Sequence, residues 1–166
     1  GGVVAVLLNQ NNATYRKIRA RFRYAALGGG LKYVMIDANQ RGEIDAALDS
    51  AFRKERAVGV VVMSDALFYD ERQRIVKRVA AARRAAIYPD RAYVAAGGLM
   101  SYGPAIEANF ERAAGYVDRI LKGAAPADLP VEEPREYRLD INRRTARALA
   151  IKVPAELLKQ AQAVLG

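Results

Sequence analysis

The chain has 166 residues, with 27 Lys and Arg against 18 Asp and Glu, and therefore a net charge of +9. It contains no Cys, no His and no Trp, which excludes disulfides, thiolate metal sites and the Ser-His-Asp and Cys-His nucleophiles. Any metal site would need oxygen ligands only, so the composition favours a binding protein without metal or other cofactor over an enzyme.

Short apolar runs alternate with amphipathic segments along most of the chain. The apolar runs predict buried strands, and they lie at Val3–Leu8, Leu31–Ile36, Val58–Met63, Ala85–Tyr88 and Leu99–Tyr102. Apolar residues at helical spacing predict helices, at about Ala13–Leu27, Gly42–Arg56, Tyr69–Arg83 and, after a single turn at Arg91–Ala95, from Gly103-Pro104 onward. The glycines of Gly28-Gly29-Gly30 are expected to end the first helix.

The helix that starts at Gly103-Pro104 carries an apolar stripe, formed by Ile106, Phe110, Ala113, Val117, Ile120 and Leu121. Three prolines, at 126, 130 and 134, then indicate an extended connector. Alternating apolar and charged residues in Glu136–Ile141 predict a half-exposed edge strand. Asn142 is expected to cap a short helix that runs through Leu149. Pro154 is expected to start a last helix, with Leu157, Leu158, Ala161 and Val164 as its apolar residues.

This order predicts the α/β class, a three-layer αβα arrangement with an open, mostly parallel sheet and helices on both faces. In such sheets ligands bind at the carboxyl ends of the strands. The segments that would form this edge are Asn9–Asn11, Ser64–Phe68, Tyr88-Pro89 and Ser101–Gly103.

Asp65 directly follows a predicted buried strand, where receiver domains carry a phosphoacceptor. Those domains also need an acidic pair after the first strand for Mg²⁺, and Asn9-Gln10-Asn11 stands there instead. Asp65 is therefore expected either to cap the next helix or to hold the ammonium group of a ligand. The aromatic residues near the strand ends fit either core packing or the wall of a small-molecule pocket; they are Phe68, Tyr69, Tyr88 and Tyr102.

The basic residues gather on two predicted helices, and their spacing places them on the solvated sides. No basic stretch carries a nucleic-acid-binding motif, so we interpret the positive charge as helix surface and expect no nucleic-acid partner. The longest apolar stretches have about six residues, far fewer than the ~20 that span a bilayer.

Several stretches go beyond general patterns. Ile87-Tyr88-Pro89 is followed by YVAAGGLMSYGP at Tyr93–Pro104, by AAGYVDRILKG at Ala113–Gly123 and by LPVE at Leu129–Glu132. Together with Leu139–Asn142, these motifs resemble stretches of the ABC transporter substrate-binding proteins often labelled tryptophan/tyrosine transport-like. The resemblance covers nearly the whole chain and is most specific from Ile87 to Pro130.

The resemblance implies a type I periplasmic-binding fold, in which two α/β lobes joined by a hinge close over a small ligand. Residues 1–166 would form the C-terminal lobe, and residues 99–123 would include the segment that crosses into the N-terminal lobe. The apolar stripe of that segment would then lack its partner, so we expect self-association or a rearranged packing of the isolated half.

The implied function is that of the solute-binding component of an ABC importer, a non-enzyme that captures a small molecule such as an amino acid and works with a membrane permease. The resemblance assigns the ligand contacts of this half to Asn9, Asp65, Phe68, Tyr88, Ser101 and Tyr102. There are two rival interpretations. The first is the effector-binding lobe of a transcription regulator with the same fold, and the second is a stand-alone flavodoxin-like enzyme or nucleic-acid module.

The full-length protein would lie in the periplasm or be lipid-anchored outside the membrane. The chain begins at Gly1 with neither an initiator Met nor the basic and apolar regions of a signal peptide. We therefore expect it to be a fragment or a processed product.

Overall fold

A computed structural model describes residues 2–166, apart from the side chains of Ala25 and Leu27. Gly1, on which the expectation about the start of the chain depends, lies outside the described residues. The strands are β1 Val4–Leu8, β2 Tyr33–Asp37, β3 Gly59–Val62, β4 Ala85–Tyr88, β5 Met100–Pro104, β6 Tyr137–Asn142 and β7 Ala163–Leu165.

The helices alternate with the strands. The α-helices are α1 Tyr15–Gly28, α2 Ile44–Asp49, α3 Ala66–Asp70, α4 Arg72–Ala81, α5 Arg91–Ala95, α6 Ile106–Leu121, α7 Arg143–Ala148 and α8 Ala155–Gln160. The short 3-10 helices are η1 Arg41–Glu43 and η3 Pro126–Asp128, and η2 Ser50–Lys54 is a π-helix. As expected, α1 ends at the glycine run, where Gly30 has a positive φ of 62°.

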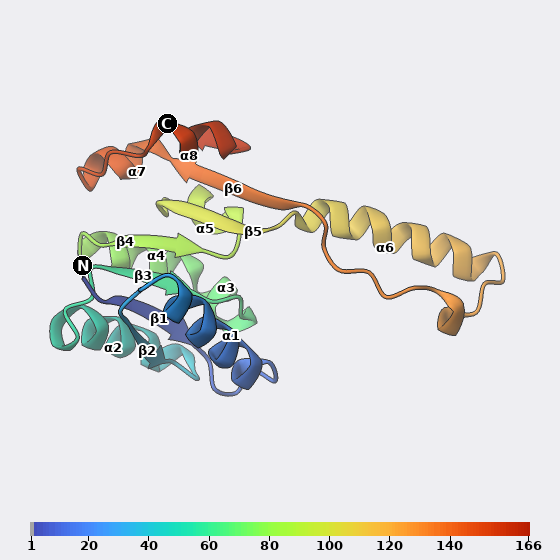
Figure 1. Cartoon of the computed structure of the whole chain (residues 1–166), viewed down its shortest axis with the longest axis horizontal. Coiled ribbons are helices and arrows are strands. Elements are labelled where there is room, and N and C mark those ends of the chain that lie inside the picture. Colours follow the sequence, from blue (N-terminus) through green and yellow to red (C-terminus); the bar gives the residue numbers. More distant parts are fainter. Residues whose placement is uncertain (1) are drawn as a thin grey trace.

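The strands form one open seven-stranded sheet in the order β2-β1-β3-β4-β5-β6-β7. The pairs are parallel except β5 and β6, which run antiparallel. Figure 1 shows α1 in front of this sheet and α4 behind it. The predicted α/β class with an open, mostly parallel sheet is therefore confirmed.

The main core lies between the sheet and the helices α2, α4 and α5. Alternate strand residues point to it, among them Ala5 and Leu7 of β1 and Val60 and Val62 of β3, and the helices contribute Ile44, Leu48, Ile75, Val76, Val79 and Tyr93. Each large side chain buried in this way stabilises the fold by roughly 1.5–3 kcal/mol. This core fixes the strand ends at which a ligand could bind.

Two arginines of α4 join it to α2. Arg74 binds Asp45 through two hydrogen bonds of 3.2 and 2.9 Å, and Arg78 pairs with Asp49. The hydrogen bond from Arg74 lowers the pKa of the Asp45 carboxyl below its usual value. Two of the arginines that the sequence assigns to solvated helix surface therefore form ion pairs between neighbouring helices.

Residues 105–136, which we call the α6 arm, project away from the sheet (Figure 1). No residue of α6 is buried, and Phe110 and Leu121 of the predicted apolar stripe are 72% and 82% exposed. The arm folds back along itself, because the Tyr116 hydroxyl donates a hydrogen bond of 2.5 Å to the carbonyl oxygen of Pro130. The chain therefore forms the amphipathic helix without covering its apolar face.

Several predicted helix boundaries are wrong. The helix expected at Tyr69–Arg83 is two helices, α3 and α4, separated at Glu71, which has a non-helical ψ of 13°. The helix expected at Gly42–Arg56 consists of η1, α2 and η2 and ends at Lys54. Pro104 ends β5 and does not start α6, which begins at Ile106.

The C-terminal end differs most from the expectation. The last helix ends at Gln160, and Ala163–Leu165 forms β7 beside β6. The main chain of Gln162 donates to the Leu139 carbonyl, and its side-chain Oε1 accepts from the Leu139 amide at 2.6 Å. These hydrogen bonds pair residues 162–165 with the sheet, although the apolar residues there have helical spacing. As a result, β6 lies between two strands and is not the predicted half-exposed edge strand.

We predict that Gly103→Ala destabilises the protein by about 2–3 kcal/mol, the cost of overpacking at a close contact. A Cβ atom at Gly103 would overlap the carbonyl oxygen of Pro89. Chemical denaturation measures the change.

Gly115→Ala is the matched control, because a Cβ at this position in α6 would meet nothing within 4 Å. Alanine in an exposed helix should stabilise it by about 0.5–1 kcal/mol. Equal effects of the two substitutions would contradict the proposed close approach of β5 to Pro89.

Candidate functional site

A groove of about 850 Å³ runs along the carboxyl ends of β3 and β4 and reaches the root of α6. Its floor comes from the ends of these strands and from the segments that follow them. Its lining residues are Phe22, Val61, Val62, Met63, Ser64, Asp65, Ala66, Tyr69, Asp70, Ile87, Tyr88, Pro89, Asp90, Tyr93, Tyr102, Gly103, Pro104, Ile106, Phe110 and Tyr137. The groove therefore occupies the edge of the sheet at which the sequence predicts ligand binding.

Asp65 fixes one end of this groove. Its Oδ1 accepts hydrogen bonds from the Leu67 amide at 2.9 Å and from Asn9 Nδ2 at 3.1 Å, and its Oδ2 accepts from Asn12 Nδ2 at 2.7 Å. The bond from Leu67 caps the N-terminus of α3. Asp65 thus caps a helix, as one of the two expectations had it, and at the same time lines the groove.

Stacked aromatic side chains lie behind the wall of the groove on the side of β4, where Tyr88 is 2% and Tyr93 0% exposed. The rings of Tyr88 and Tyr93 are stacked with centroids 4.9 Å apart, and the ring of Tyr69 meets that of Tyr93 edge-on at 6.4 Å. Burial raises the pKa of the Tyr88 and Tyr93 hydroxyls above the usual tyrosine value. Both side chains are therefore neutral at physiological pH.

A second aromatic pair forms the opposite rim. Tyr102 of β5 stacks on Tyr137 of β6, with ring centroids 5.7 Å apart, and Tyr102 is 56% exposed. Ile106 and Phe110 of α6 continue this rim. An aromatic or apolar group in the groove would therefore contact side chains on both sides.

The charge of the groove is opposite to that of the whole chain. Among the described residues that line it, three are carboxylates, Asp65, Asp70 and Asp90, and none is Lys or Arg. Asp90 caps α5 by accepting from the Ala92 amide at 2.7 Å. The groove thus combines apolar walls with three carboxylates, of which Asp70 also pairs with Arg41 at 3.7 Å. Such a lining favours a cationic group.

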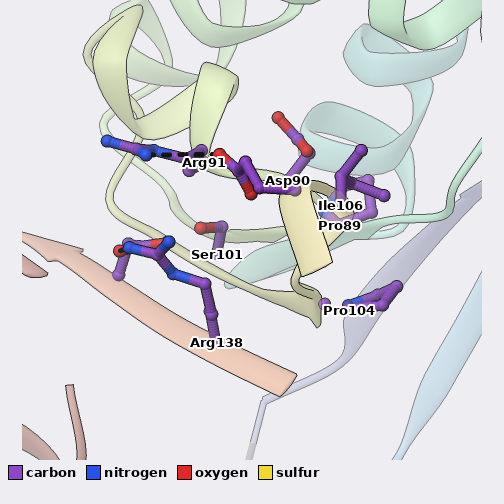
Figure 2. A pocket seen from close by; sticks show the side chains of 10 residues that line it. Pro89, Asp90, Arg91, Ser101, Pro104, Ile106 and Arg138 are labelled. Atoms are coloured by element: carbon purple, nitrogen blue, oxygen red, sulfur yellow. Dashed lines mark hydrogen bonds and ion pairs between the residues drawn. The ribbon is translucent and has the colours of Figure 1, made fainter. Parts of the chain in front are cut away.

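A much smaller cavity of about 10 Å³ adjoins the groove beneath Pro89 and Gly103. Figure 2 shows Ser101 of β5 beside Arg138 of β6 in this cavity. Glu107 at the start of α6 also lines it, and hydrogen bonding from its own backbone amide lowers the pKa of this carboxyl.

The six residues proposed from the sequence fall into three groups. Asp65 and Tyr102 line the groove, Tyr88 borders it but is only 2% exposed, and Asn9 reaches it through its hydrogen bond to Asp65. Ser101 is 1% exposed and lines the small neighbouring cavity. Phe68 is completely buried in the core, so it supports the groove from behind and offers a ligand no surface.

The sequence analysis did not assign five of the aromatic lining residues, Phe22, Tyr69, Tyr93, Phe110 and Tyr137, to the site. Tyr69 belongs to the predicted group of aromatic residues near the strand ends, and Phe110 belongs to the predicted apolar stripe of its helix. Only the fold brings α1, α6 and β6 to one edge. Of these five residues, only Tyr69 carried a signal in the sequence, as one of the aromatic residues near predicted strand ends.

Two negative findings apply to residues 2–166. No group of three or more acidic side chains is placed to hold a metal ion. No helix in this part of the chain is both long and apolar enough to cross a membrane.

Comparisons with solved structures support the fold. The chain superposes on a conserved domain protein from Vibrio cholerae O1 biovar El Tor with a TM-score of 0.89 at 22% identity, over 98% of this chain and 54% of that one. An ABC domain in complex with L-Trp from Streptococcus pneumoniae gives a TM-score of 0.89 at 22% identity, over 99% and 56%. A ligand-free, open substrate-binding protein with adhesive properties from Clostridium difficile gives 0.70 at 18% identity, over 99% and 54%.

This chain therefore spans a little more than half the length of the solved structures that it matches. A search of curated proteins found no match. The family described as ABC transporter substrate binding protein matches residues 3–165. Since this match extends over nearly every residue, the chain belongs to the ABC transporter substrate-binding protein family.

Proposed function

We propose that this chain is the C-terminal lobe of the solute-binding component of an ABC importer and that it binds a small aromatic amino acid. The observation that carries the proposal is the aromatic, acidic groove at the carboxyl ends of β3 and β4. Membership of a substrate-binding family supports a role in capturing a solute without changing it.

The groove fits the two ends of such a ligand. An aromatic ring can lie against Tyr102 and Tyr69 at the rims, because offset and edge-on ring contacts are both favourable. The ligand ammonium would lie in the field of Asp65, Asp70 and Asp90. The Streptococcus pneumoniae neighbour was solved with L-Trp, which makes L-Trp the first ligand to test.

The α6 arm supports the assignment of a single lobe. Its apolar face is exposed, and in a two-lobed protein this helix would pack in the N-terminal lobe. The chain leaves the sheet through β5 and returns through β6, so these strands would form part of the hinge. Residues 99–123 would then include the outward crossing, and closure of the lobes would cover the groove.

A solute-binding protein of this kind delivers its ligand to a membrane permease. We propose that the full-length protein works in the periplasm or anchored outside the membrane. Capture requires no reaction, so its residues need only bind, exclude water and release.

We predict that the full-length protein binds L-tryptophan at least tenfold more tightly than indole-3-propionate, which lacks the ammonium group. A hydrogen bond to a charged group contributes about 1.5–3 kcal/mol, and 1.4 kcal/mol corresponds to about tenfold in affinity. Isothermal titration calorimetry measures both. Equal affinities would show that the carboxylates do not recognise an ammonium, and the absence of binding by any aromatic amino acid would overturn the proposed ligand class.

Removing one aromatic wall tests the groove itself. Tyr102→Ala should weaken L-tryptophan binding by about tenfold, through lost ring contact. Tyr24→Ala is the matched control, because Tyr24 is 83% exposed on α1 and does not line the groove. A similar loss in both variants would place the ligand elsewhere.

The exposed face of α6 leads to a third prediction. Residues 1–166 expressed alone should self-associate through this face, which light scattering after gel filtration detects as a mass above 18.2 kDa. Val117→Glu with Leu121→Glu should restore the monomer, because charges on the apolar stripe oppose its burial.

Arg119→Glu is the control, because it changes the net charge by the same amount from the opposite side of the helix. It should leave the association unchanged. A monodisperse monomer of the unmodified chain would contradict the proposal that α6 lacks a partner.

A further inference from the structure

Three buried polar atoms of neighbouring residues have no hydrogen-bond partner among the residues that the structure describes. They are Ser101 Oγ of β5 and Arg138 Nε and Asp140 Oδ1 of β6. Burial of such atoms without a partner costs free energy, and native proteins avoid it or fill the gap with water. We therefore expect a hydrogen-bonding group between these three atoms.

The sheet brings these atoms to one place. Ser101 and Asp140 are direct cross-strand partners in the antiparallel ladder, and Arg138 is paired with Gly103, two residues along. All three side chains consequently leave the same face of the sheet. The direct approach of Arg138 Nη2 to Asp140 Oδ1 is 3.8 Å, which is too long for a hydrogen bond.

The space between them fits a single water molecule. Ser101, Arg138 and Asp140 all line the small cavity of about 10 Å³, and a volume of this order holds one water if it has two to four polar partners. Figure 2 shows the side chains of Ser101 and Arg138 next to each other there. Three partners are available.

We propose that one ordered water molecule occupies this cavity and bridges Ser101 Oγ, Arg138 Nε and Asp140 Oδ1. The water accepts a hydrogen bond from Arg138 Nε and donates one to Asp140 Oδ1, and the serine hydroxyl can take either role. The guanidinium of Arg138 disfavours a cation, and the carboxylate of Asp140 disfavours an anion. Water is the ligand that can both donate and accept.

The water lies at the root of the α6 arm. β5 leads into the arm, β6 leads out of it, and the Ala105 amide donates to the Glu136 carbonyl at 2.9 Å just beyond the two strands. A bridging water on the adjacent face adds a second connection between the strands. It thereby fixes the direction in which the arm leaves the sheet, independently of the proposed ligand.

Ser101→Ala distinguishes a filled cavity from an empty one by the sign of its effect. If water is bound, the substitution removes one of its hydrogen bonds and lowers Tm by about 2–4 °C. If the cavity is empty, the substitution removes an unpaired buried hydroxyl, and Tm is unchanged or higher. The latter result would overturn the proposal.

Ser64→Ala is the matched control, because Ser64 is exposed in the loop before α3. It should leave Tm unchanged, and a drop equal to that of Ser101→Ala would assign the effect to general loss of a hydroxyl.

A crystal structure of the protein at a resolution that reveals ordered water supplies a second measurement. We expect one peak of density within about 2.7–3.2 Å of all three atoms. An empty cavity, an ion in place of water, or side chains that pair directly would each contradict the proposal.

Discussion

The hydrogen bonds of Asp65 hold together the segments that shape the groove. Through them the carboxylate joins the loop after β1, at Asn9 and Asn12, to the first turn of α3 that follows β3. Packing of buried side chains fixes the position and register of the strands. The polar loops between them need hydrogen bonds of this kind to adopt one conformation. Because three donors orient it, the carboxylate adds a fixed negative charge to the groove.

A chain of net charge +9 presents a groove lined by carboxylates and aromatics. Arginines of α4 are engaged by other side chains. Arg74 and Arg78 pair with Asp45 and Asp49 between α4 and α2, and Arg72 stacks over the Tyr69 ring at 4.6 Å. Each exposed pair contributes little to stability. Arg72 thus lies beside the groove, although no Lys or Arg is among the described residues that line it.

The parts of the fold that the sequence predicted correctly follow from local patterns. Val4–Leu8 and Gly59–Val62 are continuous apolar runs, and such runs form buried parallel strands whatever surrounds them. Asp65 and Tyr102 lie together along the groove because strand ends meet at one edge. Phe68 is expected to contact a ligand but lies in the core, because its position within one turn of helix decides which way the side chain points. Phe110 reached the groove only through the direction of the α6 arm, which no local pattern encodes.

The error at β6 has a physical cause that links fold and function. Charged residues alternate with apolar ones there, as in an edge strand, yet β7 pairs with β6 on its far side and Asp140 is 2% exposed. Buried charge in the middle of a sheet is costly unless polar partners accompany it. Asp140 lies on the strand that leads out of the α6 arm. The proposed water would therefore supply this buried carboxylate with a partner at the place where the arm joins the sheet.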